Sequence, residues 1–167
     1  MIGWALSAAL LAVGPEVVVE GRLTTAAGES VRLSEFRGKP LLLFFEDRDS
    51  VGMNQTLKDR LFAEAKKRDL LHRVGLVAVA YLKPFDFFPA RQFALAHVRS
   101  LVEQLGIDIF VDFKGSLAGP PLWLPTDSST VLVVDRQGRV LYRHSGPHSE
   151  AEIERLVTLV SEEAVRS

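Results

Sequence analysis

The residues best placed to do chemistry form a charged turn, Glu46 to Ser50, directly after the apolar run Leu41–Phe45. In open α/β sheets, ligands bind beyond the carboxyl ends of the strands. The helix predicted after this turn presents free N–H groups that favour anions. A later polar stretch is predicted to lie across the same sheet edge. The sequence therefore predicts one candidate ligand or partner site, made of Asp47, Arg48, Asp49, Asn54, Asp127, Ser128, Ser129 and Thr130.

The same turn also has a purely structural interpretation. Asp49 or Ser50 is placed to cap the following helix, and Arg48 is placed to pair with Asp47. A hard cation bound by Asp47, Asp49 and Asp127 is a third alternative, but no three ligands have a diagnostic spacing, so no metal site is predicted. Acid–base catalysis by Asp47 and Asp49 is conceivable. Because no serine lies in a nucleophile motif, no catalytic residue is assigned.

Two loops carry more apolar side chains than loops normally do. One holds Phe85, Phe87 and Phe88, and the other holds Leu122, Trp123 and Leu124. Either these side chains fold back over the core, or they form an exposed patch for a protein or peptide partner. Phe87 and Trp123 are therefore added to the candidate binding residues.

The histidines are interpreted as structural. His97 lies on a predicted apolar helix stripe, which favours a buried core histidine over a functional one. His144 and His148 flank Gly146-Pro147, a pair that argues against a helix there, so both are predicted to lie in a surface loop.

Composition excludes several classes of chemistry. The 167 residues carry 20 Lys and Arg against 21 Asp and Glu, and no cysteine. No block of like charge points to nucleic acid or an anionic membrane. The absence of cysteine excludes disulfides, a thiolate nucleophile and cysteine-ligated metal, and no cofactor is predicted.

The start of the chain resembles an export signal. The apolar run Ile2–Val13 is too short for a bilayer, which needs roughly 20 residues, and Ala12-Val13-Gly14 is similar to a small-x-small cleavage site. The segment lacks the usual Lys or Arg, and a buried N-terminal helix is the alternative. We expect a signal peptide at 1–14, a single domain at 15–167, and export to the bacterial periplasm without a stable membrane span.

Hydrophobic periodicity predicts an α/β fold. Strands are expected at Glu16–Thr25, at Val31 before a helical turn that Ser34 caps, and at 41–45, 74–82, 109–112, 130–135 and 140–144. Helices are expected after Ser50 (stripe Met53, Leu57, Leu61, Ala65), at Ala90–Leu105 (stripe Phe93, His97, Leu101, Leu105) and after the capping box Ser149–Glu152. The last two strands should be antiparallel, in a mixed sheet with helices on both faces.

Two segments resemble the thioredoxin-fold superfamily in its peroxiredoxin and TlpA-like branches. VRLSEFRGKPLLLFF (31–45) is similar to their entry into the central strand, and TVLVVDRQGRVLYRHSG (130–146) to their later hairpin. The resemblance covers about residues 17–162. It implies a three-layer α/β/α sandwich with a central mixed sheet and an N-terminal β-hairpin extension.

A narrower resemblance is to the YtfJ family of exported bacterial proteins of unassigned function. It rests on the central turn and on Ser128-Ser129, with the turn matching at Arg48, Ser50, Met53, Asn54 and Leu57. Two features depart from the redox branches: no thiol lies between Asp47 and Asn54, and Ser129 stands where their cis-proline would shape the substrate groove.

The sequence therefore favours an exported, cysteine-less accessory module that binds a protein or peptide and is not an enzyme. The alternative is a thioredoxin- or peroxiredoxin-like oxidoreductase, as family similarity suggests, although thiol exchange needs an attacking thiolate. A third hypothesis is a protein that binds a small ligand or metal.

Overall fold

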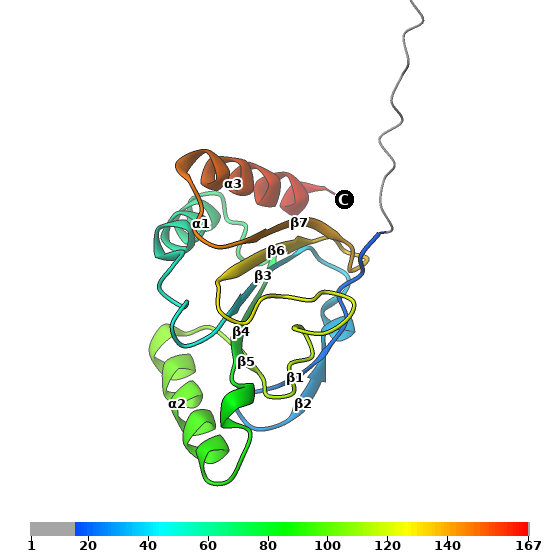
Figure 1. The fold of residues 1–167 in the computed structure, drawn as a ribbon. Helices are drawn as coiled ribbons and strands as arrows, with labels where there is room; N and C mark the ends of the chain where they lie inside the picture. Colours follow the sequence, from blue (N-terminus) through cyan, green and yellow to red (C-terminus); the bar gives the residue numbers. More distant parts are fainter. Residues whose placement is uncertain (1–15, 167) are drawn as a thin grey trace, which may run out of the picture.

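The structure is a computed structural model that describes residues 16–166. Over those residues a seven-stranded sheet has the order β2-β1-β5-β4-β3-β6-β7 (Figure 1). The strands are β1 (Arg22–Thr24), β2 (Ser30–Arg32), β3 (Leu41–Glu46), β4 (Gly75–Tyr81), β5 (Ile109–Asp112), β6 (Thr130–Val134) and β7 (Val140–Ser145). The helices are α1 (Gln55–Lys67), α2 (Ala90–Leu105) and α3 (Glu150–Val165), with short 3-10 helices η1 (Leu33–Phe36) and η2 (Lys83–Phe85).

The centre of the sheet is buried on both faces. β3 pairs in parallel with β4, and β4 with β5, while β6 and β7 continue antiparallel. Every residue of β3 and β6 is buried. A run of apolar residues with no polar alternation is stable as a strand only where both faces are covered, so these strands and the final hairpin were predictable, and both predictions are confirmed.

Two layers cover the sheet. On one face, Leu42 and Phe44 of β3 pack with Leu57 of α1 and Leu156 of α3. α2 covers the same face over β5, and Figure 1 shows all three helices on one side of the sheet. The opposite layer is built from η1 and a long loop, whose buried side chains are Leu33, Leu117, Leu122 and Leu124. The predicted α/β class, with a central mixed sheet and an N-terminal hairpin, is confirmed. Helices were expected on both faces, but the three α-helices lie on one face, and the 3-10 helix η1 and the loop cover the other.

The first predicted strand, Glu16–Thr25, is divided in two. Residues 17–19 bond to the start of β7, through Val19 N–H to the Gly138 carbonyl (2.7 Å) and Val140 N–H to the Val17 carbonyl (2.9 Å). β1 begins only at Arg22 and pairs with β2 and β5 at the other side of the sheet. One straight strand cannot pair with both sides, so the segment is interrupted at Glu20-Gly21. Ser34 lies inside η1 and is not its cap, so that prediction was wrong.

The face that α2 buries differs from the prediction. The bounds Ala90–Leu105 and the terminating Gly106 (φ +66°) are as predicted. Buried Val98 and half-buried Ala94, Leu95 and Val102 pack on Val111 of β5. Leu101 of the predicted stripe is also half-buried. Phe93, at 71% exposure, Leu105 and His97 face solvent, so the prediction of a core histidine was wrong. The helix has apolar residues on two faces, and only packing selects between them.

α3 starts at the predicted capping box. The Ser149 hydroxyl accepts from the Glu152 N–H (3.3 Å), and the Glu152 carboxylate accepts from the Ser149 N–H (2.6 Å). No helix within residues 16–166 has both the length and the apolar character that crossing a bilayer requires. The predicted signal segment, 1–14, lies outside the described residues.

Candidate functional site

The turn after β3 closes on itself. The Asp47 N–H donates to the Ser50 hydroxyl (3.1 Å), and the Ser50 N–H donates to the Asp47 carboxylate (2.8 Å). α1 begins five residues later, at Gln55, and no side chain caps it. The prediction that Asp49 or Ser50 caps this helix was therefore wrong, because the polar groups of Asp47 and Ser50 are already used within the turn. Arg48 and Asp49 are exposed at its tip.

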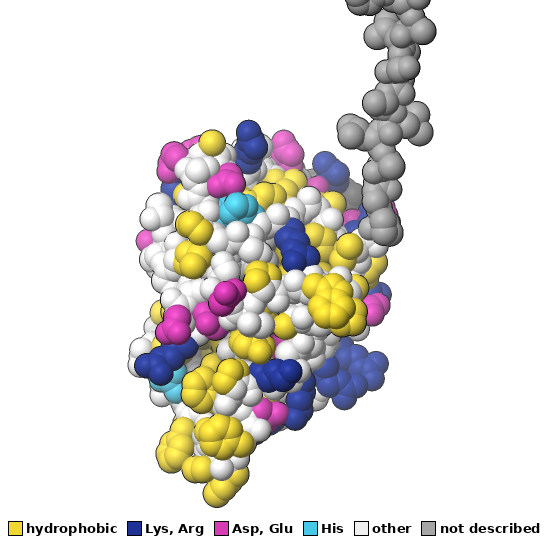
Figure 2. Space-filling model, viewed as in Figure 1, with side chains coloured by type: hydrophobic (Ala, Val, Ile, Leu, Met, Phe, Trp, Pro, Cys, Tyr) yellow, Lys and Arg dark blue, Asp and Glu magenta, His cyan; other side chains and the backbone are white. Residues whose placement is uncertain are grey.

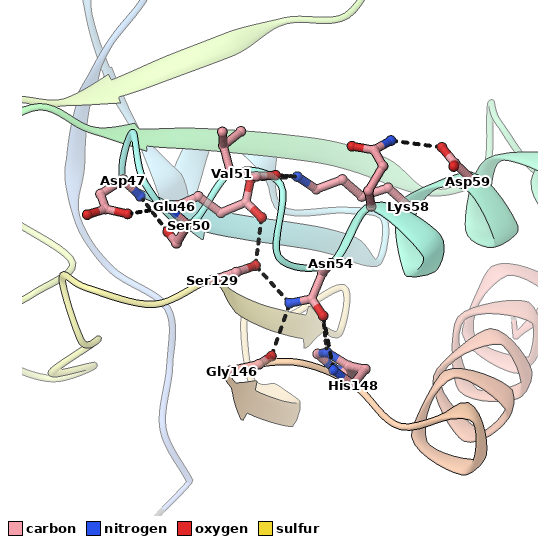
Figure 3. A network of polar contacts seen from close by, with 11 residues as sticks. Glu46, Asp47, Ser50, Val51, Asn54, Lys58, Asp59, Ser129, Gly146 and His148 are labelled. Carbon is pink, nitrogen blue, oxygen red and sulfur yellow. Dashed lines mark hydrogen bonds and ion pairs between the residues drawn. The ribbon is translucent and has the colours of Figure 1, made fainter.

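Asn54 is the residue that joins this turn to the rest of the sheet edge (Figure 3). Its side chain is 3% exposed. Its amide nitrogen donates to the Ser129 hydroxyl (2.9 Å) and to the Gly146 carbonyl (3.1 Å). Its oxygen accepts from the His148 N–H (3.1 Å) and lies 2.9 Å from His148 Nδ1. One amide thus fixes the start of α1 against β6 and the β7–α3 connection.

A buried ion pair extends the network on the other side of Ser129. The fully buried Ser129 hydroxyl donates to Glu46 Oε1 (2.6 Å), and Lys58 Nζ donates to Glu46 Oε2 (2.7 Å). Lys58 Nζ also donates to the Val51 carbonyl (2.7 Å). A buried carboxylate needs both a countercharge and hydrogen bonds, and Glu46 receives both. Figure 3 shows the network running without interruption from Lys58 to His148.

His148 ends the network in a less complete environment. Its ring lies 4.4 Å from that of His144, centroid to centroid, and 6.1 Å from that of Tyr142. Burial lowers the pKa of His148, and the neighbouring His144 lowers it further. The buried His148 Nε2 and Tyr142 Oη have no hydrogen-bond partner within the described part of the chain. The neutral form of His148 is favoured. His148 lies in the loop between β7 and α3, as predicted, but it is half-buried, whereas His144 lies in β7 and not in a loop.

The predicted site residues divide into two groups. Asn54, Ser129 and Thr130 are buried, and Thr130 Oγ1 lies 2.8 Å from the Ser145 hydroxyl. Arg48, Asp49 and Asp127 are exposed and form no ion pair within residues 16–166. Half-buried Asp47 belongs to the closed turn, and half-buried Ser128 touches Met53 Sδ (3.8 Å).

The buried members are hydrogen-bonded: Asn54 to Ser129, and Thr130 to Ser145. Hollows of about 430 and 350 Å³ lie elsewhere, around Glu20 and Gly21. Among residues 16–166, no three acidic or histidine side chains converge as a metal site would require.

Sequence reasoning placed Glu46 in the charged turn, but it left Glu46, Lys58 and His148 out of the predicted site residues. Glu46 carried a signal, because it is the single charge at the end of an apolar strand. No sequence pattern pointed to Lys58 or His148, because Lys58 bonds to Glu46, 12 positions away, and His148 to Asn54, 94 positions away.

The two apolar loops do expose their aromatic side chains. The phenylalanine loop (Phe85–Phe88) shows Phe87 at 59% and Phe88 at 81% exposure, and Trp123 is 66% exposed. Leu122 and Leu124 are buried, so the alternative of folding back holds for them alone. Figure 2 shows apolar side chains on one face, over the η2–α2 connection and over the 113–129 loop.

The phenylalanine loop is anchored by charge. Asp86 accepts from Lys114 (2.6 Å) and from Arg91 at the start of α2. These two cations lower the pKa of Asp86, and the hydrogen bond from Lys114 has the largest effect. The Arg91 guanidinium also lies 4.2 Å from the ring centre of Phe113. The loop is thus tied to α2 and to the residues after β5, while its phenylalanines stay exposed.

Trp123 is held in a strained backbone conformation. Its φ is +49°, in the left-handed region that is uncommon for bulky residues. The Arg143 guanidinium donates to the carbonyls of Leu122 and Trp123, the latter at 3.1 Å, and the Trp123 N–H donates to Gly119 (2.8 Å). With Leu122 and Leu124 buried on either side, this geometry directs the indole outwards.

No family model matches the chain, and no curated protein matches it. Solved structures do. A proposed thiol:disulfide interchange protein DsbE from Chlorobium tepidum is 21% identical, with a TM-score of 0.61, over 88% of this chain and 94% of that one. A DsbF homologue from Corynebacterium diphtheriae is 17% identical, with a TM-score of 0.61, over 90% and 88% of the two chains. The thiol peroxidase of Chromobacterium violaceum is 12% identical, with a TM-score of 0.59, over 87% and 84%.

The chain has a thioredoxin-like fold. At these identities the likeness shows the fold and carries no activity over to this chain. One of these structures is named for thiol:disulfide interchange and one is a thiol peroxidase, whereas this chain has no cysteine. At the carboxyl end of its central strand, a closed network of Glu46, Lys58, Ser129, Asn54 and His148 stands instead.

Proposed function

We propose that this protein is an exported, cysteine-less thioredoxin-fold module that binds a protein or peptide partner. The binding surface consists of Trp123 and the phenylalanine loop, flanked by the exposed rim residues Arg48, Asp49 and Asp127. Thiol exchange requires a thiolate that the chain does not have, and the buried side chains of Glu46, Ser129 and Asn54 are hydrogen-bonded to one another. These two features support binding over catalysis.

The geometry of Trp123 is the observation that carries this proposal. A left-handed backbone at a bulky residue costs about 1–3 kcal/mol and persists only where the surroundings enforce it. Here Arg143 and two buried leucines enforce it, and the result is an indole exposed to 66%. Tryptophan is among the residues that contribute most to protein interfaces, and an indole fixed before binding loses little conformational entropy on contact.

Export rests on the N-terminal apolar run and on the narrower resemblance to the YtfJ family. Both support a cleaved signal at 1–14 and a periplasmic location. The test is expression of the full chain in a bacterial host, followed by fractionation and intact mass. A mature protein that begins after Gly14 in the periplasmic fraction supports export, and an uncleaved cytoplasmic chain contradicts it.

Site-specific photo-crosslinking in the native organism tests the binding role. A photo-crosslinking residue replaces Thr126, three positions after Trp123 in the same loop, and in a second variant it replaces Phe88. In a control variant it replaces exposed Lys66 at the end of α1. We expect one defined protein in the Thr126 and Phe88 adducts, absent from the Lys66 adduct.

The same experiment with Trp123→Ala decides whether the capture is specific. Because the indole is mostly exposed, this change should leave the fold intact while reducing the Thr126 adduct at least about tenfold, the loss that corresponds to 1.4 kcal/mol. Adducts that are the same at all three positions, or that survive Trp123→Ala unchanged, would contradict the proposed surface.

A further inference from the structure

Two arginines face each other across the N-terminal hairpin. Arg22 of β1 and Arg32 of β2 are directly opposite partners in antiparallel register, and both are exposed. Opposite residues in such a pair point to the same face, with Cβ atoms about 4.5–5.5 Å apart, and like charges there destabilise the hairpin. A pairing that weakens the isolated protein invites a functional explanation.

Neither guanidinium is neutralised by the chain itself. Within residues 16–166, no carboxylate oxygen lies within 4.0 Å of either one, although Arg60, Arg91 and Arg139 all have such partners. The Arg32 backbone N–H is bonded to Glu35 (3.0 Å), which fixes the residue but leaves its guanidinium free. Both positive charges are therefore available to a ligand.

The two arginines line a hollow of about 350 Å³, together with Glu20, Gly21 and Ser34. A second hollow of about 430 Å³ shares Glu20 and Gly21 and is bounded by the loop at Gly119–Pro121. Ser34 is exposed, and since it does not cap η1, its hydroxyl is free to donate into the first hollow. Figure 2 shows Lys and Arg side chains gathered on the side of the molecule where Figure 1 places β1 and β2.

We propose that this hollow is an oxyanion-binding site, in which Arg22 and Arg32 hold one carboxylate or phosphate group and Ser34 donates a hydrogen bond to it. Planar guanidinium groups match both anions in a two-point arrangement. The Glu20 carboxylate on the same wall repels negative charge, so the site accepts one anionic group and disfavours a polyanion. This site is separate from the aromatic surface and does not depend on the proposed function.

Side-chain NMR on the full chain tests the site directly. The arginine Nε–H resonances are followed while sodium phosphate, and in a second series sodium acetate, replace sodium chloride at constant ionic strength. Saturable shifts at Arg22 and Arg32 are expected. If only phosphate produces these shifts, the natural ligand carries a phosphate group. If only acetate produces them, the ligand carries a carboxylate. Shifts with both anions support a general oxyanion site. Shifts that rise linearly with anion concentration without saturating, or that are equally large at exposed Arg73, overturn the proposal.

Substitutions at the lining residues should change the affinity for the anion in predictable directions. Arg22→Gln and Arg32→Gln should weaken binding at least tenfold, and Glu20→Gln should strengthen it severalfold. The matched control Arg73→Gln, at an exposed arginine after α1, should leave binding unchanged. An affinity that is the same in Arg22→Gln as in the unmodified chain overturns the site.

Thermal unfolding supplies a second readout. At low ionic strength without a binding anion, Arg22→Gln should raise the Tm, because it removes the repulsion between the two arginines. The anion-dependent rise in Tm, which a ligand of the folded state produces, should be lost in the same variant. A rise of equal size in both proteins would be a general salt effect and would overturn the proposal.

Discussion

Among single residues, Asn54 joins distant parts of the chain through its side-chain hydrogen bonds. Its amide contacts β6 through Ser129 and the β7–α3 connection through Gly146 and His148. A side-chain amide offers two donors and an acceptor with two lone pairs, so one Asn can bond groups on two other segments at once. An aliphatic residue in its place would leave the Gly146 carbonyl and the His148 N–H without this partner, and Ser129 with only its bond to Glu46.

Asn54→Ala should therefore be strongly destabilising. Each buried polar group left without a partner costs about 1–3 kcal/mol, and some of these groups can relax, so we expect unfolding free energy to fall by about 2–4 kcal/mol. Urea denaturation followed by circular dichroism measures this. Gln55→Ala is the matched control, since exposed Gln55 contacts only Asp59 (2.8 Å) through its side chain, and should change stability by less than about 0.5 kcal/mol.

His148 makes the stability depend on pH in a defined direction. Its pKa in the folded protein lies below the unfolded value of 6.5, because of burial and of the nearby His144, while Glu152 opposes the shift. The unfolded chain then binds more protons, and stability rises with pH. This contribution is fully present above pH 6.5 and is lost as pH falls from there through the folded pKa.

We predict that His148→Gln flattens this part of the stability–pH profile. Urea unfolding at pH 7.5, 6.5 and 5.5 measures the slope, and His72→Gln, on the exposed turn after α1, serves as the control. The groups facing His148 are His144, Tyr142, Glu152 and Asn54, all unchanged in both variants. If His148→Gln and the unmodified protein have the same slope between pH 7.5 and 5.5, another group is responsible.

At the level of elements, the η2–α2 connection shows how charge can hold an apolar loop open. Asp86 joins Lys114, which follows β5, to Arg91 of α2, so the loop has two fixed points beside its exposed phenylalanines. Asp86→Asn should loosen the loop without unfolding the protein. Because such surface pairs contribute about 0.2–1 kcal/mol, amide exchange of residues 84–88 should speed up by about two- to fivefold.

Hydrogen exchange with mass spectrometry can resolve that change. Asp59→Asn is the matched control, since Asp59 is an exposed acid with a single side-chain partner, Gln55. It should leave exchange in 84–88 at the unmodified rate. Equal exchange in Asp86→Asn and the unmodified protein would show that packing of Arg91 on Phe113, rather than the ion pairs, fixes the loop.

Sequence patterns predicted the elements better than the contacts between them. β3 and β6 were predictable because uninterrupted apolar runs require two covered faces, and α3 because its capping box is local. The buried face of α2 was not, since Phe93 and Leu105 form as good an apolar stripe as Val98 and Val102 do. The cap of α1 failed for a related reason: Asp47 and Ser50 had a closer partner in each other.

The same limit applies to the candidate site. Local spacing located Asn54 and Ser129 at one sheet edge, because both adjoin the ends of recognisable elements. It could not show that Ser129 would bond to Glu46, 83 positions away, or Asn54 to His148, 94 positions away. Those partners depend on which strands become neighbours, a property of the sheet order that one-dimensional periodicity does not contain.

For the whole molecule, a similar fold belongs to the thiol peroxidase of Chromobacterium violaceum, whereas here the end of the central strand carries a polar network. Exchange and peroxide reduction both begin with attack by a thiolate, and the chain contains none. Glu46 and Ser129, which occupy the carboxyl end of β3 and the residue before β6, are 8% and 0% exposed and bonded to each other. A substrate therefore meets neither a nucleophile nor an accessible acid at this position.

We predict that the purified protein reduces insulin disulfides with dithiothreitol, and consumes hydrogen peroxide, no faster than buffer alone. A cysteine-containing thioredoxin is the positive control in the insulin assay. Turnover that scales with protein concentration and survives pretreatment with iodoacetamide, which inactivates contaminating thiol enzymes, would contradict this prediction. The fold would then support redox chemistry without a thiol, which no side chain within residues 16–166 is positioned to supply.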